Sequence, residues 1–145
     1  MFTNDHSAGP IQQWLIFLCD NCSFVIQQMT IDCSILEVNA IQSVYLNAMI
    51  YYCAFHVLQA WNCNLKSKVR LDASYIAEEQ QQLHNNMMQT LKVIMCENSI
   101  NLMYAAIEEF KDIFYDQYEF LDYFQEYWEP EHIIRRWAYA YIDPS

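Results

Sequence analysis

The scarcity of turn-forming residues is the strongest constraint on how this chain can fold. Its 145 residues include one Gly and three Pro, whereas aromatic residues make up 16% of the chain. A β-sandwich or β-barrel needs a turn about every 8–12 residues, and most such turns rely on Gly or Pro. The sequence therefore excludes an all-β fold and predicts a chain that is mainly helical. A single Gly also excludes the glycine-rich phosphate loops of P-loop and dinucleotide-binding proteins.

The chain is strongly acidic. It contains 18 Asp and Glu but only 7 Lys and Arg, which gives a net charge of −11, and no Lys or Arg precedes Lys66. Phosphate backbones are bound by clustered Lys and Arg, so this charge argues against direct contact of the chain with DNA. Residues 97–131 hold ten acids and one basic residue, Lys111. A solvated helical face explains this stretch, and the alternative is an acidic docking surface for another protein.

The cellular location is predicted from what the sequence does not contain. Residues 1–9 have neither the basic segment nor the apolar run of a signal peptide. The longest apolar runs fall short of the ~20 residues that a membrane span requires. We therefore expect an intracellular, soluble chain without a membrane segment, whose six cysteines are reduced rather than paired in disulfides.

The hydrophobic pattern divides the chain into two parts. Up to residue 70, helical and strand patterns alternate, with a polar break at 19–23. The expected elements are helices at 10–18, 34–44 and 55–68 and strands at 24–31 and 48–53. This order predicts two parallel strands joined by a right-handed crossover. Every later pattern is helical, so we expect an α/β, mostly helical fold with an α/β part at 1–70 and an all-helical part at 71–145.

Asp32 is the first candidate for chemistry. It directly follows the strand that ends at Ile31, and open α/β sheets place their ligands at the carboxyl ends of the strands. A carboxylate at that position can hold Mg²⁺, which prefers oxygen ligands. The alternative is an Asp that ends the strand and supports the next helix. That helix is expected to begin at Ser34, with Glu37 in the capping-box position.

Cysteine and histidine offer a second candidate site. Cys53 and His56 form a Cys-x₂-His pair, and Cys19 and Cys22 form a Cys-x₂-Cys pair, so together they supply four soft ligands for zinc. The 31 positions from Cys22 to Cys53 exceed the spacing of a zinc finger, so buried thiols are favoured over zinc. A nucleophilic dyad of Cys53 and His56 is also disfavoured, because an apolar strand does not support the thiolate it needs.

Four stretches of the sequence, taken together, resemble the transposases of Mutator-like elements, the MULE family. They are 3–10 leading into 14–18, 29–34 with Glu37 and 39–41, 52–61, and 120–124 with Trp128 and 136–141. In this order they span nearly the whole chain. The resemblance implies a ribonuclease H-like core with an all-helical insertion. It also implies that two Asp and one Glu bind two Mg²⁺ or Mn²⁺ ions, which activate water and a 3′-hydroxyl for attack on DNA.

By this resemblance Asp32 is the second of the three acids, and Cys53 and His56 are the family's Cys-x₂-His motif. Asp20 and His56 are candidates for auxiliary ligands. The family's first Asp lies on a hairpin upstream of the matched region, and its Glu lies in a Thr-Asn-Asn-x-x-Glu block after the insertion. The sequence contains neither, and it reads Ala-Tyr-Ile142 where the family usually continues Ala-Tyr-Arg. The resemblance therefore implies a partial, nuclear transposase core without activity of its own.

The alternative function is an acidic, helical protein–protein interaction module. The two interpretations differ in the behaviour they predict in solution. A partial sheet leaves unpaired strand edges, and neither Met29–Ile31 nor Met49–Tyr52 contains a charge or a Pro that would block pairing. A partial transposase core is therefore expected to self-associate, and to do so more strongly as salt screens the repulsion between acidic chains.

Overall fold

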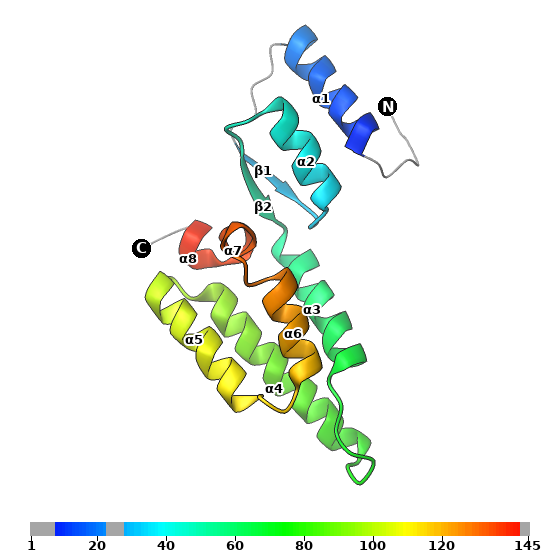
Figure 1. Ribbon diagram of the computed structural model, residues 1–145, viewed down its shortest axis with the longest axis vertical. Helices are drawn as coiled ribbons and strands as arrows, with labels where there is room; N and C mark the ends of the chain where they lie inside the picture. Colours follow the sequence, from blue (N-terminus) through cyan, green and yellow to red (C-terminus); the bar gives the residue numbers. More distant parts are fainter. Residues whose placement is uncertain (1–7, 23–27, 143–145) are drawn as a thin grey trace. The chain divides into compact units, whose positions relative to one another are not determined.

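The fold is described by a computed structural model that places residues 8–22 and 28–142 (Figure 1). The chain divides into two compact units, residues 1–53 and residues 54–145. The described chain is mostly helical and contains a small parallel sheet, which confirms the predicted mostly helical α/β class. The division lies one helix before residue 70, where the sequence pattern places the boundary. The reason is that the helix at 54–68 packs against other helices of the second unit.

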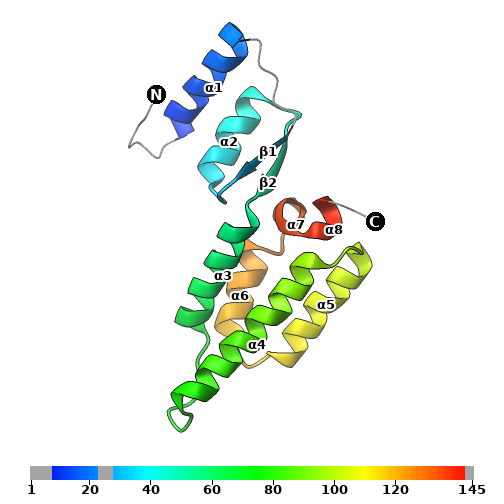
Figure 2. The ribbon, with the colours of Figure 1, turned by 180° about the vertical axis from the view of Figure 1, so that it is seen from behind.

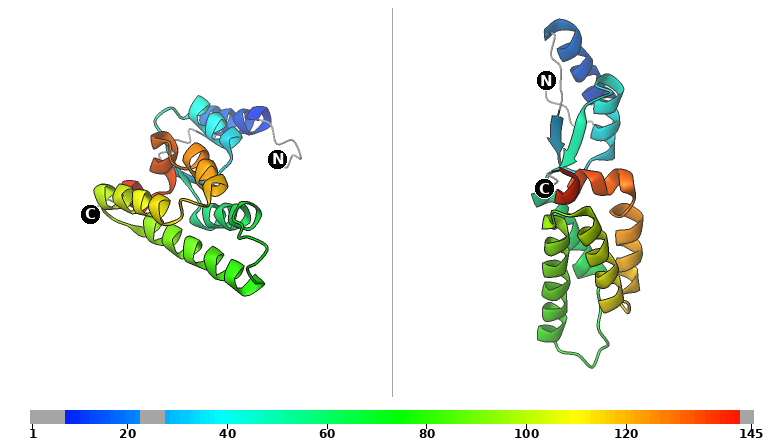
Figure 3. Two further views of the ribbon diagram at one scale, coloured as in Figure 1. Left: turned by 60° about the horizontal axis from the view of Figure 1, so that its bottom comes forward. Right: turned by 90° about the vertical axis from the view of Figure 1, so that its left-hand side faces the viewer.

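The first unit is an α/β arrangement of four elements. They are α1 (Ala8–Cys22), β1 (Gln28–Ile31), α2 (Ile35–Val44) and β2 (Met49–Tyr52). The two strands are parallel, as predicted, with Gln28 opposite Met49 and Ile31 opposite Tyr52 (Figure 3). Residues 24–27 of the predicted first strand lie outside the described residues. The buried apolar side chains of this unit are Leu15, Ile31, Val38, Ala40, Ile41, Tyr45, Ile50 and Tyr52.

The two helices of the first unit agree with the sequence pattern to different degrees. Ser34 begins α2 as predicted, and its hydroxyl oxygen accepts a hydrogen bond from the backbone N–H of Glu37 at 3.3 Å. The polar break predicted at 19–23 is wrong as far as Cys22, because α1 continues to that residue. Asp20 and Asn21 lower helix propensity by less than about 1 kcal/mol each, which does not end a helix that packs against α2.

The second unit is entirely helical among its described residues (Figure 2). Its helices are α3 (Ala54–Lys68), α4 (Ala77–Cys96), α5 (Ile100–Ile113), α6 (Tyr118–Tyr127), α7 (Glu131–Trp137) and α8 (Tyr139–Ile142). The hairpin of α4 and α5 packs against α8, and α3 packs against α4 and α6. The residues after Pro130 form two short helices rather than one, because Ala138 adopts an extended backbone conformation.

Aromatic rings form the centre of the helical unit. The side chain of Trp61 is fully buried in α3. Its ring centroid lies 5.9 Å from that of Phe124, 5.7 Å from that of Trp128 and 5.0 Å from that of Trp137. The contacts to the two Trp rings are edge-on, the geometry that aromatic quadrupoles favour. These aromatic residues, which come from different helices, therefore form the core of the helical unit.

Two glutamine side chains hold the connection between α3 and α4. Gln117 is 5% exposed; its carbonyl oxygen accepts the N–H of Arg70 and its amide donates to the C=O of Arg70, both at 3.1 Å. Gln80 accepts the N–H of Leu71 at 2.9 Å and donates to the C=O of Val69 at 2.6 Å. Four backbone groups that this connection leaves outside helical hydrogen bonds are thereby satisfied. The connection needs no Gly or Pro.

Candidate functional site

Asp32 and Cys53 lie at the same end of the sheet. Each is the first residue after its strand, and the last strand residues, Ile31 and Tyr52, are paired. The N–H of Cys53 donates to the C=O of Ile31 at 2.6 Å and so extends the ladder by one bond. Asp32 is exposed and Cys53 is half-buried. The side chain of Asp32 is therefore accessible at the edge where parallel sheets bind ligands.

Glu37 lies beside Asp32, a position that the sequence pattern did not assign to it. Its backbone N–H donates to the Ser34 cap of α2, and a protonated Glu37 side chain can hydrogen-bond with the carboxylate of Asp32. Burial, the charge of Asp32 and this hydrogen bond, in that order, raise the pKa of Glu37 above its ordinary value. The sequence signal was an acid five positions after Asp32, across a strand–helix junction. Only the conformation of the junction brings the two carboxyls together.

Cys33 supplies that conformation. Its φ of 76° lies in the left-handed region, and it is the one residue other than Gly with positive φ among the described residues. This conformation costs a residue with a Cβ about 1–2 kcal/mol. Burial, together with the charges of Asp32 and Cys53, raises the pKa of the Cys33 thiol to about 12. Cys33 therefore turns the backbone and stays a thiol, which makes it a poor nucleophile.

A cavity of about 260 Å³ has Glu37 in its wall. Its walls include Trp14 and Leu15 of α1, Met29 and Ile31 of β1, and Glu37 and Ile41 of α2. Glu37 is the one ionisable residue in this lining, and the other lining residues are apolar. Trp14 is 47% exposed, so part of its indole ring is accessible to solvent. The first unit therefore presents an apolar cavity with a carboxyl in its wall.

The predicted pairing of Cys53 with His56 spans the two units, because the chain divides between residues 53 and 54. His56 lies in the first turn of α3 and is half-buried. Its ring contacts the ring of Phe55 edge-on, and its Nδ1 atom is buried without a hydrogen-bond partner among the residues that the structure describes. For Cys19, Asp20 and Cys22 the structure describes the helical backbone and not the side chains, so zinc binding by these residues stays a prediction.

A two-metal centre is not assembled by the described residues. Across residues 8–22 and 28–142, no group of three or more described His, Cys, Asp or Glu side chains is placed to hold a metal ion. The oxygens of Asp32 and Glu37 have the chemistry that Mg²⁺ prefers. A two-metal centre, however, needs several carboxylates around ions that lie about 4 Å apart. These two residues by themselves do not meet that requirement.

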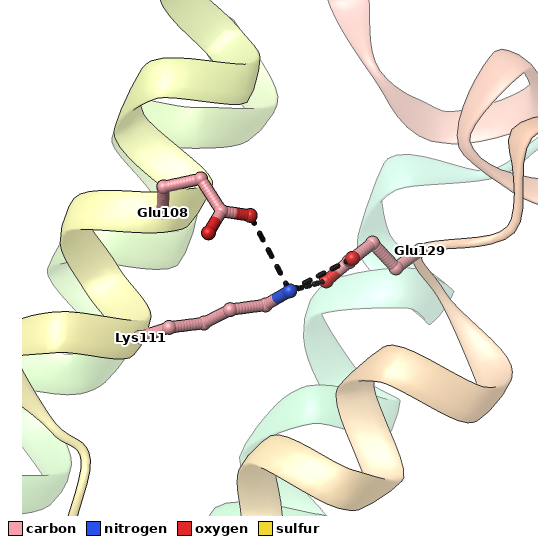
Figure 4. Close-up of polar contacts among 3 residues, drawn as sticks. All are labelled: Glu108, Lys111 and Glu129. Carbon is pink, nitrogen blue, oxygen red and sulfur yellow. Dashed lines mark hydrogen bonds and ion pairs between the residues drawn. The ribbon is translucent and has the colours of Figure 1, made fainter.

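In the helical unit, two carboxylates pair with a basic side chain, Lys111 (Figure 4). The Nζ atom of Lys111 lies 2.6 Å from Oε1 of Glu129 and 3.5 Å from Oε1 of Glu108. Lys111 and Glu129 are each 22% exposed, and their ion pair joins α5 to the connection between α6 and α7. Part of the acidic stretch at 97–131 therefore has a structural role.

Comparisons with other proteins leave the family resemblance untested. Neither the family models nor the curated proteins nor the solved structures gave a significant match to this chain. Within the described part of the chain, no helix has the length and apolar character needed to cross a membrane. The resemblance to Mutator-like transposases therefore rests on the sequence stretches that carry it.

Proposed function

We propose that this chain derives from the transposase of a Mutator-like element. In this proposal the first unit is part of a ribonuclease H-like core, and the second unit is the all-helical insertion. The observation that supports it is the parallel β1–α2–β2 arrangement with Asp32 directly after β1. The resemblance places the second of the family's three acids at this position. The change from an α/β unit to an all-helical unit follows the same order as in the family.

In this proposal the ancestral process is DNA transposition, and Asp32 was a metal-binding acid in the ancestral core. The proposal gives these 145 residues no strand cleavage or strand transfer of their own. Two-metal chemistry needs several converging carboxylates, and the resemblance matches Asp32 alone among the three acids. The first 53 residues also contain no Lys or Arg that could bind a phosphate backbone. A nuclear location follows from the proposed ancestry.

Activity is tested by incubating the purified chain with supercoiled plasmid at increasing Mg²⁺ or Mn²⁺. The expected result is no nicking at any concentration. Nicking that disappears in Asp32→Asn and persists in Asp72→Asn, an exposed acid of the helical unit, would contradict the absence of activity. Ancestry is tested separately in the flanking genomic sequence. A Thr-Asn-Asn-x-x-Glu block downstream supports it, and the absence of both further acids from intact flanking reading frames counts against it.

A second candidate function, an acidic protein–protein interaction module, is supported by a groove between α4 and α5. The groove has a volume of about 290 Å³, and its walls include Val93, Ile94, Phe110 and Ile113 together with the acid Glu109. Val93 and Ile113 are more than half exposed. Apolar side chains beside an acid are suited to an amphipathic partner helix that carries a basic residue.

Sedimentation at low and high salt separates the two functions. A partial sheet with open strand edges is expected to self-associate, and to do so more strongly when salt screens repulsion beyond ~8 Å. A compact monomer at both salt concentrations would favour the interaction module. In that case, Val93→Asp is expected to abolish binding of a partner helix, whereas Val93→Ala weakens it.

A further inference from the structure

The two neighbouring carboxyls of the first unit have no basic side chain of that unit to neutralise them. Asp32 lies close enough to Glu37 to raise the pKa of the Glu37 carboxyl, after the larger effect of burial, and residues 1–53 include no Lys or Arg. The helical unit differs in this respect, because Lys111 lies between Glu108 and Glu129 (Figure 4). A cation that reaches Asp32 and Glu37 would therefore meet negative charge that the unit itself leaves uncompensated.

The cavity beside this pair has the composition of a site for an organic cation. Glu37 lies in its wall and can pair with an ammonium or guanidinium group. Trp14 lies in the same wall, and the face of an indole ring attracts cations. The remaining lining is apolar and suits a hydrocarbon body. Its volume of about 260 Å³ is just below the usual range of ligand pockets, so the occupant must be small.

We propose that this cavity binds a small organic cation, consisting of an ammonium or guanidinium group on an aryl or alkyl body. The charged group lies at Glu37, and the apolar body lies against Trp14 and Ile41. A bare divalent ion is a weaker candidate, because it would leave the apolar wall without a partner. The inference concerns the cavity wall and does not depend on the proposed transposase ancestry.

The test uses three ligands with the same aryl body: 2-phenylethylammonium, 2-phenylethanol and 3-phenylpropionate. Binding is followed by tryptophan emission and by calorimetry on the full chain. Trp14 is 47% exposed, whereas Trp61, Trp128 and Trp137 are at most 6% exposed, so Trp14 dominates the response to ligand. We expect the ammonium to bind about tenfold more tightly than the alcohol, from one ion pair and one cation–π contact, and the carboxylate not to bind.

Variants show whether Glu37 is the cause of this preference. Glu37→Gln keeps the side-chain size and the backbone N–H that caps α2, and it is expected to make the ammonium and the alcohol bind equally. Trp14→Phe should remove the emission response while calorimetry still detects binding. Glu126→Gln, an exposed acid of α6, is the matched control and should leave binding unchanged.

Three outcomes would overturn the proposal. The first is equal affinity for the ammonium and the alcohol in the unaltered chain. The second is an ammonium preference that survives in Glu37→Gln, with circular dichroism showing that the variant is folded. The third is displacement of the ammonium ligand by an equimolar amount of Mg²⁺. None of these readouts measures DNA cleavage, so the failure of this proposal is distinguishable from the failure of the proposed function.

Discussion

The two units of this chain differ in backbone strain and in how their charged groups are balanced. In the helical unit, the side chains of Gln117 and Gln80 hydrogen-bond with the backbone of the connection between α3 and α4, and Lys111 forms an ion pair with Glu129. In the α/β unit, Cys33 has a positive φ and two acids lie next to each other without a basic residue in residues 1–53. Both features lie at the β1–α2 junction, next to an open apolar cavity.

This difference indicates which unit carries a site and which is scaffold. Strained backbone and unbalanced charge lower stability, and in proteins they concentrate where a ligand or a reaction uses them. Aromatic packing and satisfied backbone groups raise stability. Substitutions in the core of the helical unit are therefore expected to lower the free energy of unfolding. Substitutions that relieve the positive φ of Cys33 or the adjacent acids at the β1–α2 junction are expected to raise it.

The largest effect is expected for Trp61→Ala in the helical core. The change removes the ring contacts with Phe124, Trp128 and Trp137 and leaves a cavity at a fully buried position. We expect the free energy of unfolding to fall by about 3–5 kcal/mol, measured by urea denaturation. Tyr115→Ala, at an exposed aromatic residue, is the control and should change stability by less than about 0.5 kcal/mol. A loss below about 1 kcal/mol for Trp61→Ala would show that the aromatic core contributes little to the stability of the helical unit.

A smaller loss is expected for Gln117→Ala. This change leaves the N–H and C=O of Arg70 without their side-chain partner at a site that is 5% exposed. Unsatisfied buried groups cost about 1–3 kcal/mol, and denaturation should show a loss in this range. Gln81→Ala, which removes an exposed hydrogen bond to Asn85, is the matched control. Equal losses for the two substitutions would show that the hydrogen bonds of Gln117 to Arg70 stabilise the fold no more than an exposed side-chain hydrogen bond does.

A gain is expected for Cys33→Gly at the β1–α2 junction. Gly adopts positive φ without the steric cost that a Cβ imposes, and its greater freedom in the unfolded chain offsets part of the benefit. We expect a net gain of about 0.5–1 kcal/mol in the free energy of unfolding. Cys33→Ala keeps the Cβ and should give no such gain. If Cys33→Gly lowers stability more than Cys33→Ala does, the junction is not strained in the way that we infer.

The smallest effect, and the one that depends on pH, is expected for Glu37→Gln. Because the pKa of Glu37 is raised in the folded chain, the folded state holds this proton more tightly than the unfolded state does. The stability contributed by Glu37 is complete below its ordinary pKa of 4.5 and is lost as pH rises through the folded value. At neutral pH, Glu37→Gln should therefore gain a few tenths of a kcal/mol, a small value because solvent screens the pair.

The control for this prediction is the same measurement in acid. Below the ordinary pKa, both Glu37 and its Gln replacement are neutral, so the two chains should be equally stable. Denaturation curves at neutral and acidic pH give both values from one pair of proteins. A gain that is the same at both pH values would mean that neither the burial of Glu37 nor repulsion from Asp32 is its cause.

Local sequence patterns predict most helices and strands, because the interactions that favour each of them act within a few residues of the chain. Ser34 and Glu37 predict the start of α2 through a hydrogen bond within one turn, and the structure contains it. The apolar spacing predicts Val57, Leu58, Trp61 and Leu65 on the inward face of α3. Leu58 is half-buried, and the other three are fully buried. The end of α1 and the break at Ala138 were not predicted. Both depend on whether packing against other helices outweighs weak local preferences.

The sequence by itself determined the helical class, the parallel strand pair and the position of Asp32 after the first strand. The scarcity of Gly and Pro indicates the helical class, and the apolar periodicity indicates the individual helices and strands. Both patterns reflect interactions within a few residues of the chain. Only the tertiary structure decided that Glu37 meets Asp32, that Trp14 faces the same cavity and that His56 belongs to the other unit. Such juxtapositions depend on the backbone conformation at Cys33 and on packing between α1, β1 and α2. No spacing within the sequence encodes either one, because contacts between elements are set by the whole fold.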